Sequence, residues 1–131
     1  MFREIQIQTA KRREFLDITQ LISDMVQELD EGIVVVFSPH TTAAVTINEN
    51  WDPDVLHDVL LFWDRQVPRA IPGFRHGEGN SDSHILTSIF GPSITVMVHN
   101  GKLKLGHWQG IYLCEFDGPR MRNCWIQTVS T

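Results

Sequence analysis

Short runs of β-branched and aromatic residues recur along this chain, each bounded by polar or turn-forming residues. Residues 33–37 form an unbroken run that is too short for a helix, which predicts a central strand buried on both faces. Residues 3–9 alternate polar and apolar side chains, as a half-buried strand does. Four more extended segments are predicted, at residues 41–47, 93–99, 111–116 and 121–129. Mostly antiparallel sheets therefore form the predicted core.

Two turn signals predict how neighbouring strands pair. Asn100-Gly101 is a dipeptide preferred in two-residue hairpin loops, so the strand at 93–99 is expected to return from Lys102. Asp117-Gly118-Pro119 separates the last two predicted strands. This second signal predicts a closing hairpin between residues 111–116 and 121–129.

The first predicted helix spans residues 18–29, where apolar side chains recur at spacings of three and four. Asp17 with Gln20 three residues later resembles a capping box, and Gly32 supplies a stop. This periodicity predicts one buried stripe along the helix.

Two further helices are predicted in the middle of the chain. Asp52-Pro53 is a cap and first-turn pair that opens a helix ending near Gln66. A short helix is expected at 84–90, ending at Gly91. The inner face of the longer helix is predicted to carry Val55, Val59, Phe62 and Trp63.

The composition predicts one α+β domain over residues 1–131, because 42% hydrophobic and 21% charged residues is an ordinary globular balance. A net charge of −5 gives no electrostatic reason to expect nucleic acid or a membrane as partner. No signal peptide or membrane-spanning segment is recognisable, so a cytoplasmic protein is expected. In that reducing compartment Cys114 and Cys124 are predicted to be free packing residues rather than a disulfide.

Three histidines fall in segments that packing explains least. His40 follows a predicted buried strand, His76 lies in the long polar segment 68–83, and His84 opens the next helix. Imidazole is the commonest zinc ligand, and three of them leave a fourth position for water or substrate. The pattern predicts a divalent metal site, with zinc as the metal. Surface or hydrogen-bonded histidines are the alternative.

Several polar residues near these histidines are candidates for proton transfer. Glu49 is the preferred general base, because it stands in an Asn-Glu-Asn cluster just before a helix cap. Its alternative is a solvated loop carboxylate. The candidates to orient an imidazole or accept a proton also include Asp58, Glu78, Asn80 and Asp82.

Arg120 and Arg122 are two residues apart on a predicted strand, so both should point to the same face. Guanidinium groups match phosphate oxygens, and Thr41 and Thr42 could add hydroxyl donors. The sequence therefore predicts a phosphate or pyrophosphate ligand. The alternative is an exposed strand face on which these arginines meet Glu115 or Asp117.

Trp108 lies in the segment Gly106-His107-Trp108-Gln109-Gly110, whose glycines permit a sharp bend between two strands. Its indole either stacks on a heterocyclic ligand or covers the core, and core packing is favoured.

Three ordered motifs, HTTAAVTINEN at 40–50, HGEGNSDSH at 76–84 and GKLKLGHWQGIYLCEFDGPRMR at 101–122, closely resemble the YjbQ family, also called UPF0047. The likeness runs from about Ile5 to Val129. The family commonly has Gly-Thr-Trp-Gln where this chain has His107 in place of the threonine. His107 therefore either adds a ligand or leaves the role of a hydroxyl unfilled.

The resemblance implies an α+β fold with a β-sandwich-like core, a homotrimer, and a secondary thiamine-phosphate synthase activity. That reaction joins a pyrimidine pyrophosphate to a thiazole phosphate, and it leaves room for magnesium with the pyrophosphate. A metal-dependent phosphoester hydrolase and a non-catalytic trimeric binding module are the alternatives. Residue by residue, the resemblance implies a metal bound by His40, His76 and His84, catalytic Glu49, Asn80 and Gln109, and anion-binding Arg120 and Arg122.

Overall fold

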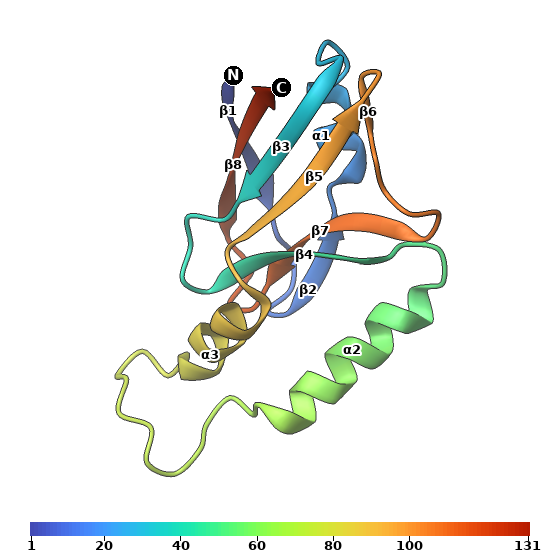
Figure 1. Ribbon diagram of the computed structural model, residues 1–131. Coiled ribbons are helices and arrows are strands. Elements are labelled where there is room, and N and C mark those ends of the chain that lie inside the picture. Colours follow the sequence, from blue (N-terminus) through green and yellow to red (C-terminus); the bar gives the residue numbers. More distant parts are fainter.

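The computed structural model describes all 131 residues and shows a mixed α+β fold of eight strands and three helices (Figure 1). The strands are β1 (Phe2–Gln8), β2 (Glu14–Asp17), β3 (Glu31–Phe37), β4 (Ala43–Glu49), β5 (Ser93–His99), β6 (Lys102–Leu103), β7 (Gln109–Glu115) and β8 (Met121–Ser130). The helices are α1 (Thr19–Met25), α2 (Pro53–Gln66) and α3 (Ser81–Phe90).

The strands form two sheets in which all neighbours are antiparallel. One sheet has five strands in the order β1-β8-β3-β5-β6, and the other has three in the order β2-β7-β4. The strands of the two sheets cross where the sheets face each other (Figure 1). This arrangement confirms the predicted α+β class and its mostly antiparallel core.

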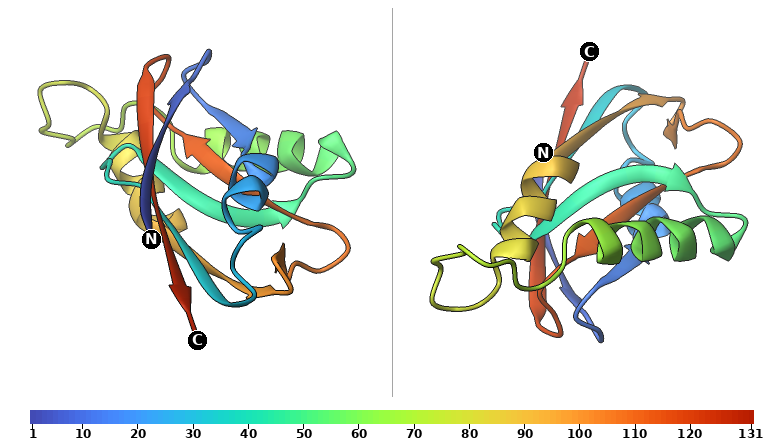
Figure 2. Two further views of the ribbon diagram at one scale, coloured as in Figure 1. Left: turned by 90° about the horizontal axis from the view of Figure 1, so that it is seen from above. Right: turned by 90° about the horizontal axis from the view of Figure 1, so that it is seen from below.

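Two apolar clusters lie on opposite faces of the three-stranded sheet. The larger fills the space between the sheets, with α1 closing one end; it includes Ile22, Val34 and Leu113. The smaller lies between the three-stranded sheet and helices α2 and α3, which cover that face in the view from below (Figure 2). Tyr112 and Cys114 belong to it, so β7 is buried on both faces.

Three sequence predictions are confirmed closely. Strand β1 forms at the N-terminus and pairs with β8. Asn100 and Gly101 take positive φ angles of 52° and 71° in the turn between β5 and β6, as a two-residue hairpin requires. Helix α2 begins after Asp52, whose Oδ1 accepts a hydrogen bond of 2.9 Å from the Asp54 amide.

The predicted closing hairpin is wrong, because β7 and β8 belong to different sheets. β7 pairs with β2 and β4, while β8 pairs with β1 and β3. Cys114 therefore does not lie opposite Cys124 on a neighbouring strand. Both cysteines are free and buried, as expected of packing residues, and burial raises the pKa of Cys124 to about 11.

Helix α1 is shorter than predicted, because it ends at Met25. The following turn lets the chain enter β3 at Glu31. The predicted capping box is also absent: Asp17 Oδ1 accepts a 2.9 Å hydrogen bond from the amide of Thr19, and Ile18 occupies the cap position. The buried stripe itself is confirmed at Ile18 and Ile22.

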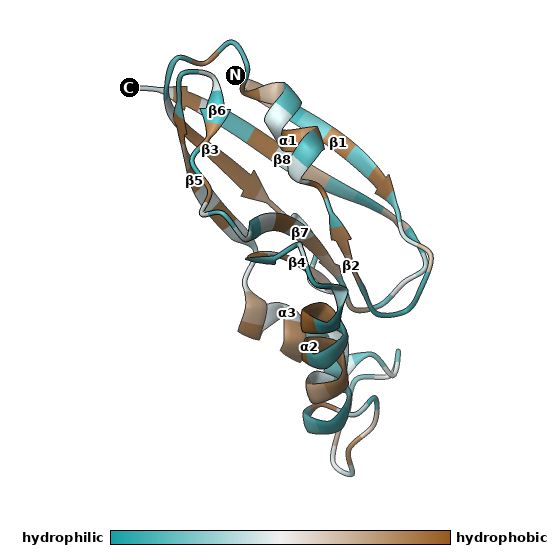
Figure 3. Ribbon diagram, turned by 90° about the vertical axis from the view of Figure 1, so that its right-hand side faces the viewer, coloured by the Kyte–Doolittle hydropathy of each residue, from teal (hydrophilic) through white to brown (hydrophobic).

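Two elements are less buried than predicted. In β3 only one face is fully buried, and Val35 on the opposite face is partly exposed. Helix α2 has no buried residue at all, and Phe62 of its predicted inner face is 53% exposed. Hydrophobic residues recur along helix α2 and along the strands of the five-stranded sheet (Figure 3).

Helix α3 begins at Ser81, three residues before the predicted start. The polar connection from α2 therefore ends at Asn80. It projects away from the body of the molecule (Figure 1). No helix of the structure is long and apolar enough to cross a membrane.

Candidate functional site

A buried ion pair between the two sheets anchors one end of the molecule. Arg122 Nε of β8 donates to the Glu115 carboxylate of β7 at 2.9 and 3.0 Å, and both side chains are almost fully buried. Arg122 Nη2 also donates to Thr42 Oγ1 at 2.9 Å, while Thr9 Oγ1 donates to Glu115 at 2.7 Å. Among the arginine nitrogens only Nη1 has no hydrogen bond. Arg122 is therefore mainly a structural residue here, and its contact with any ligand is limited to Nη1.

His40 lies beside this pair, in the middle of the β3–β4 loop. Its Nε2 accepts a hydrogen bond of 2.8 Å from the backbone amide of Asn123. Burial and the nearby positive charge of Arg122 lower the pKa of His40, which favours the neutral ring. Because an amide only donates, the ring proton of neutral His40 must be on Nδ1. His40 is thus arranged as a hydrogen-bond donor, and its Nε2 lone pair is not free to bind a metal.

Asp117 connects the start of α3 with Arg120. Asn80 Nδ2 donates to Asp117 Oδ2 at 2.8 Å, and Arg120 Nη2 donates to the same oxygen at 3.2 Å. Asn80 is 6% exposed and its Oδ1 is buried without a partner, whereas the Arg120 side chain is 52% exposed. We call Asn80, Asp117 and Arg120, together with the neighbouring His40, the Asp117 site. Arg120 does not share a strand face with Arg122, because it precedes β8.

The first turn of α3 is held by a buried carboxylate, Asp82. The sequence predicted for this residue only a role in orienting an imidazole or accepting a proton. Asp82 is fully buried and accepts from Arg12 Nη1 at 2.8 Å and from Arg13 Nη2 at 2.7 Å. Burial alone would raise the pKa of Asp82, but the hydrogen bonds and charges of these arginines lower it overall. The two arginines were not identified from the sequence. A run of three basic residues, Lys11 to Arg13, between two strands was the only available signal.

His76 and His84 come together at this end of α3. Their ring centres are 5.3 Å apart and their planes are nearly perpendicular, at 89°. Zinc binds imidazole nitrogen at roughly 2.0–2.1 Å, so two rings on one tetrahedral ion have centres about 5 Å apart. The observed distance between ring centres is compatible with one shared divalent ion and equally with a direct edge-to-face contact between the rings. Within one chain, no three histidine, cysteine, aspartate or glutamate side chains come close enough together to hold a metal ion. His40 therefore does not join His76 and His84 in a three-histidine site.

Glu49 and Gln109 lie at the opposite end of the three-stranded sheet. They face each other across β4 and β7, whereas Ala43 faces Glu115 at the other end of the same pair. Six residue steps at about 3.3 Å each separate the two ends by about 20 Å. Within one chain these two predicted catalytic residues are thus remote from the Asp117 site.

The remaining predicted residues are dispersed. Thr42 is 6% exposed and bound to Arg122, while the neighbouring Thr41 is exposed. Asp58 Oδ1 accepts a hydrogen bond of 2.9 Å from the His57 ring on the outside of α2. Trp108 is 54% exposed, so the interpretation that it covers the core is wrong.

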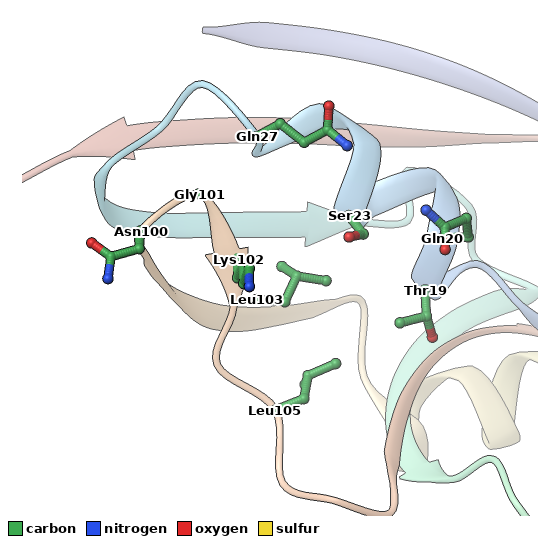
Figure 4. A pocket seen from close by; sticks show the side chains of 9 residues that line it. All are labelled: Thr19, Gln20, Ser23, Gln27, Asn100, Gly101, Lys102, Leu103 and Leu105. Atoms are coloured by element: carbon green, nitrogen blue, oxygen red, sulfur yellow. The ribbon is translucent and has the colours of Figure 1, made fainter.

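The main groove in the surface lies elsewhere. It runs between α1 and the β5–β6 hairpin, and its lining residues include Gln20, Gln27 and Lys102 (Figure 4). None of the predicted site residues contributes to it.

Comparison with known proteins gives a consistent result. A family model described as UPF0047 protein YjbQ-like matches residues 3–131. UPF0047 protein YugU of Bacillus subtilis (strain 168) is 48% identical over 129 residues, which cover 97% of this chain and 98% of that protein. A UPF0047 protein of Methanocaldococcus jannaschii is 46% identical over 131 residues, which cover 98% of this chain and 94% of that protein.

Solved structures agree with the sequence comparison. The crystal structure of an uncharacterised YjbQ/UPF0047 protein from Clostridium acetobutylicum superposes with a TM-score of 0.93 at 46% identity, covering 97% of this chain and 99% of that one. These relatives are named for their family and not for a reaction.

Proposed function

This chain belongs to the YjbQ-like UPF0047 family, and from its site we propose that it is a metal-assisted enzyme acting on a phosphorylated small molecule. The reaction that we propose is thiamine-phosphate synthesis. The observation that supports it is the His76–His84 pair, whose ring centres lie at a distance suited to one ion. The exposed Arg120 is linked to the start of the same helix through Asp117 and Asn80. Zinc suits the imidazoles, and magnesium suits a pyrophosphate group.

The Asp117 site, the His76–His84 pair, and Thr41 and Arg122 would have separate roles. His76 and His84 would hold the cation, which when bound supplies charge neutralisation for a leaving phosphate or pyrophosphate. Arg120 would bind phosphate oxygens with its exposed guanidinium, and Arg122 could reach them only through Nη1. His40 would donate from Nδ1–H, and Thr41 would offer its hydroxyl. Asn80 positions Asp117, which in turn orients Arg120.

One observation favours a second candidate, a non-catalytic module that binds a phosphate-bearing ligand. The preferred general base, Glu49, is about 20 Å along β4 from the Asp117 site within one chain. Binding needs no base, whereas hydrolysis or transfer with Glu49 as base needs that carboxylate near the ligand. The two candidates therefore differ in what Glu49 must do.

We expect His84→Ala to lose its metal and its function. Removing one of two imidazoles should abolish tight binding, so zinc measured by elemental analysis should fall well below the wild-type content. In a thiamine-requiring strain that lacks its principal synthase, wild type should restore growth, and His84→Ala and Arg120→Ala should not.

His57→Ala is the matched control, because His57 is exposed on α2 and contacts only Asp58. It should keep both metal and growth. Undiminished zinc in His84→Ala would refute the ligand assignment. Zinc loss in that variant, with no growth even for wild type, would favour the binding module over the enzyme.

We further propose that the protein is a homotrimer whose copies share the site. Apolar side chains stay uncovered on α2 and on the outer face of the five-stranded sheet, where Met97 is 66% and Val129 is 44% exposed. Surfaces of this kind commonly mark protein interfaces. In such an assembly a neighbouring copy could bring its Glu49 and Gln109 to the Asp117 site.

Co-expression of two inactive variants tests this sharing. If Glu49 and His84 of one site come from different copies, Glu49→Gln and His84→Ala should each fail to restore growth alone but restore it together. Light scattering should give three times the chain mass. Failure of the mixture, with both variants present in one trimer, would exclude a shared site while leaving the metal proposal intact.

A further inference from the structure

Three aromatic rings form an exposed corner at the end of the sheet that carries Glu49. Trp51 and Trp108 have ring centres 5.5 Å apart and planes at 80°, and they are 62% and 54% exposed. His107 stacks on Trp51 at 5.5 Å and 27°. We call these three residues the tryptophan corner. Two indoles this open to solvent are unusual for a residue type that is normally well buried.

The corner is held in place by two hydrogen bonds between two loops. The Asn50 amide donates to Trp108 O at 3.0 Å, and Trp51 Nε1 donates to His107 O at 3.1 Å. These bonds join the β4–α2 loop to the β6–β7 loop. The ring faces are therefore presented in a fixed arrangement rather than on a free loop.

The charged side chains around the tryptophan corner are acidic, and none of them has a cationic partner. Asp17 accepts only from Thr19 and Asn50, Glu49 only from the Asp52 amide, and Asp52 only from the Asp54 amide. Asp17 and Glu49 both raise the pKa of the adjacent Tyr112, although burial raises it more, which indicates that their charges act on the same small region.

At the opposite end of the three-stranded sheet, the carboxylates do have cationic partners. Every ion pair that involves a lysine or arginine there uses Arg12, Arg13, Arg120 or Arg122. The two ends of the three-stranded sheet thus differ in charge chemistry: guanidinium groups at one, unpaired carboxylates with indole faces at the other.

We propose that the tryptophan corner is a binding site for an organic cation of the alkylammonium class. A cation over the face of tryptophan is attracted by the ring quadrupole, most strongly for tryptophan among the aromatic residues. Asp17, Glu49 and Asp52 add long-range attraction for a positive charge. This inference does not depend on the metal and phosphate function, but it uses Glu49, which the shared-site proposal also uses. A guanidinium group of a neighbouring copy beside Glu49 would exclude the organic cation from the corner.

Choline and its neutral isostere 3,3-dimethylbutan-1-ol, added to the assembled wild-type protein, provide the test. The indole N–H signals of Trp51 and Trp108 in ¹⁵N–¹H spectra should shift with choline in a saturable way. The isostere has the same shape without the charge, so it should bind about two- to fivefold more weakly. Added salt should weaken choline binding.

Variants separate the corner from other exposed tryptophans. Trp108→Leu should weaken choline binding by about two- to fivefold, whereas Trp108→Phe, which keeps an aromatic face, should retain most of it. Trp125→Leu is the matched control, because Trp125 is 39% exposed on the outer face of the five-stranded sheet. It should bind choline as wild type does.

Two results would overturn the inference. Equal binding of choline and the isostere would show an apolar surface without cation selectivity. The absence of any saturable shift at Trp51 and Trp108, including the case in which a second copy covers the corner, would show that no such site is open in the assembled protein.

Discussion

Replacing Arg122 with methionine is expected to lower the free energy of unfolding by about 3 to 5 kcal/mol. The substitution removes the only cation that pairs with Glu115, which is fully buried between the sheets. The carboxylate would keep neutral donors from Thr9 and the Asp117 amide, but a buried charge without a counter-charge is costly. Urea unfolding, followed by tryptophan fluorescence at one fixed protein concentration, measures the loss.

Arg120→Met is the matched control for this prediction. Arg120 is two residues away and also pairs with a carboxylate, but its side chain is 52% exposed. Exposed pairs contribute roughly 0 to 1 kcal/mol, so this variant should unfold almost as wild type does. Adding Glu115→Gln to Arg122→Met should recover part of the loss, because it removes the unpaired charge. Equal stability of the Arg122 and Arg120 variants would contradict the structural role assigned to Arg122.

The periodicity of the sequence predicted the elements of this fold better than their partners. Helix α2 and the β5–β6 turn were correct because a cap residue and an Asn-Gly dipeptide act within a few residues. The closing hairpin failed because β8 pairs with β1 and β3, more than eighty residues earlier in the chain. The continuous apolar run in β7 was the usable signal, since a strand buried on both faces belongs at the centre of a sheet.

The candidate site was predictable only in part for the same reason. His76 and His84 are eight residues apart, and the turn before α3 brings their rings together. Arg12 and Asp82 are 70 residues apart, and no local pattern marks them as partners. Glu49 and Gln109 are neighbours across β4 and β7, but their distance from Arg120 follows from strand direction, which the sequence motifs do not encode. The sequence motifs therefore identified candidate site residues but did not predict which of them lie close together in the folded protein.

Asp82→Asn is expected to lower the free energy of unfolding by about 2 to 3 kcal/mol. The amide keeps the size of the carboxylate but not its charge, so Arg12 and Arg13 lose the fully buried anion between them. The loss is smaller than for Arg122→Met, because the two arginine side chains are 26% and 12% exposed and Arg13 keeps Asp64. Asp58→Asn is the control, since that side chain is 76% exposed and should change stability little.

The contribution of Asp82 should also depend on pH in a defined direction. Its pKa in the folded protein is lowered from the ordinary value of 3.8, so the folded state binds this proton more weakly than the unfolded chain does. The stabilisation is therefore complete well above pH 3.8 and is lost as the pH falls through 3.8 toward the lower folded-state pKa. The stability difference between wild type and Asp82→Asn, measured by urea unfolding from neutral pH downward, should stay constant to about pH 5 and then shrink. A difference that stayed constant below pH 3.8, or grew, would mean that Asp82 is not the ionised partner of Arg12 and Arg13.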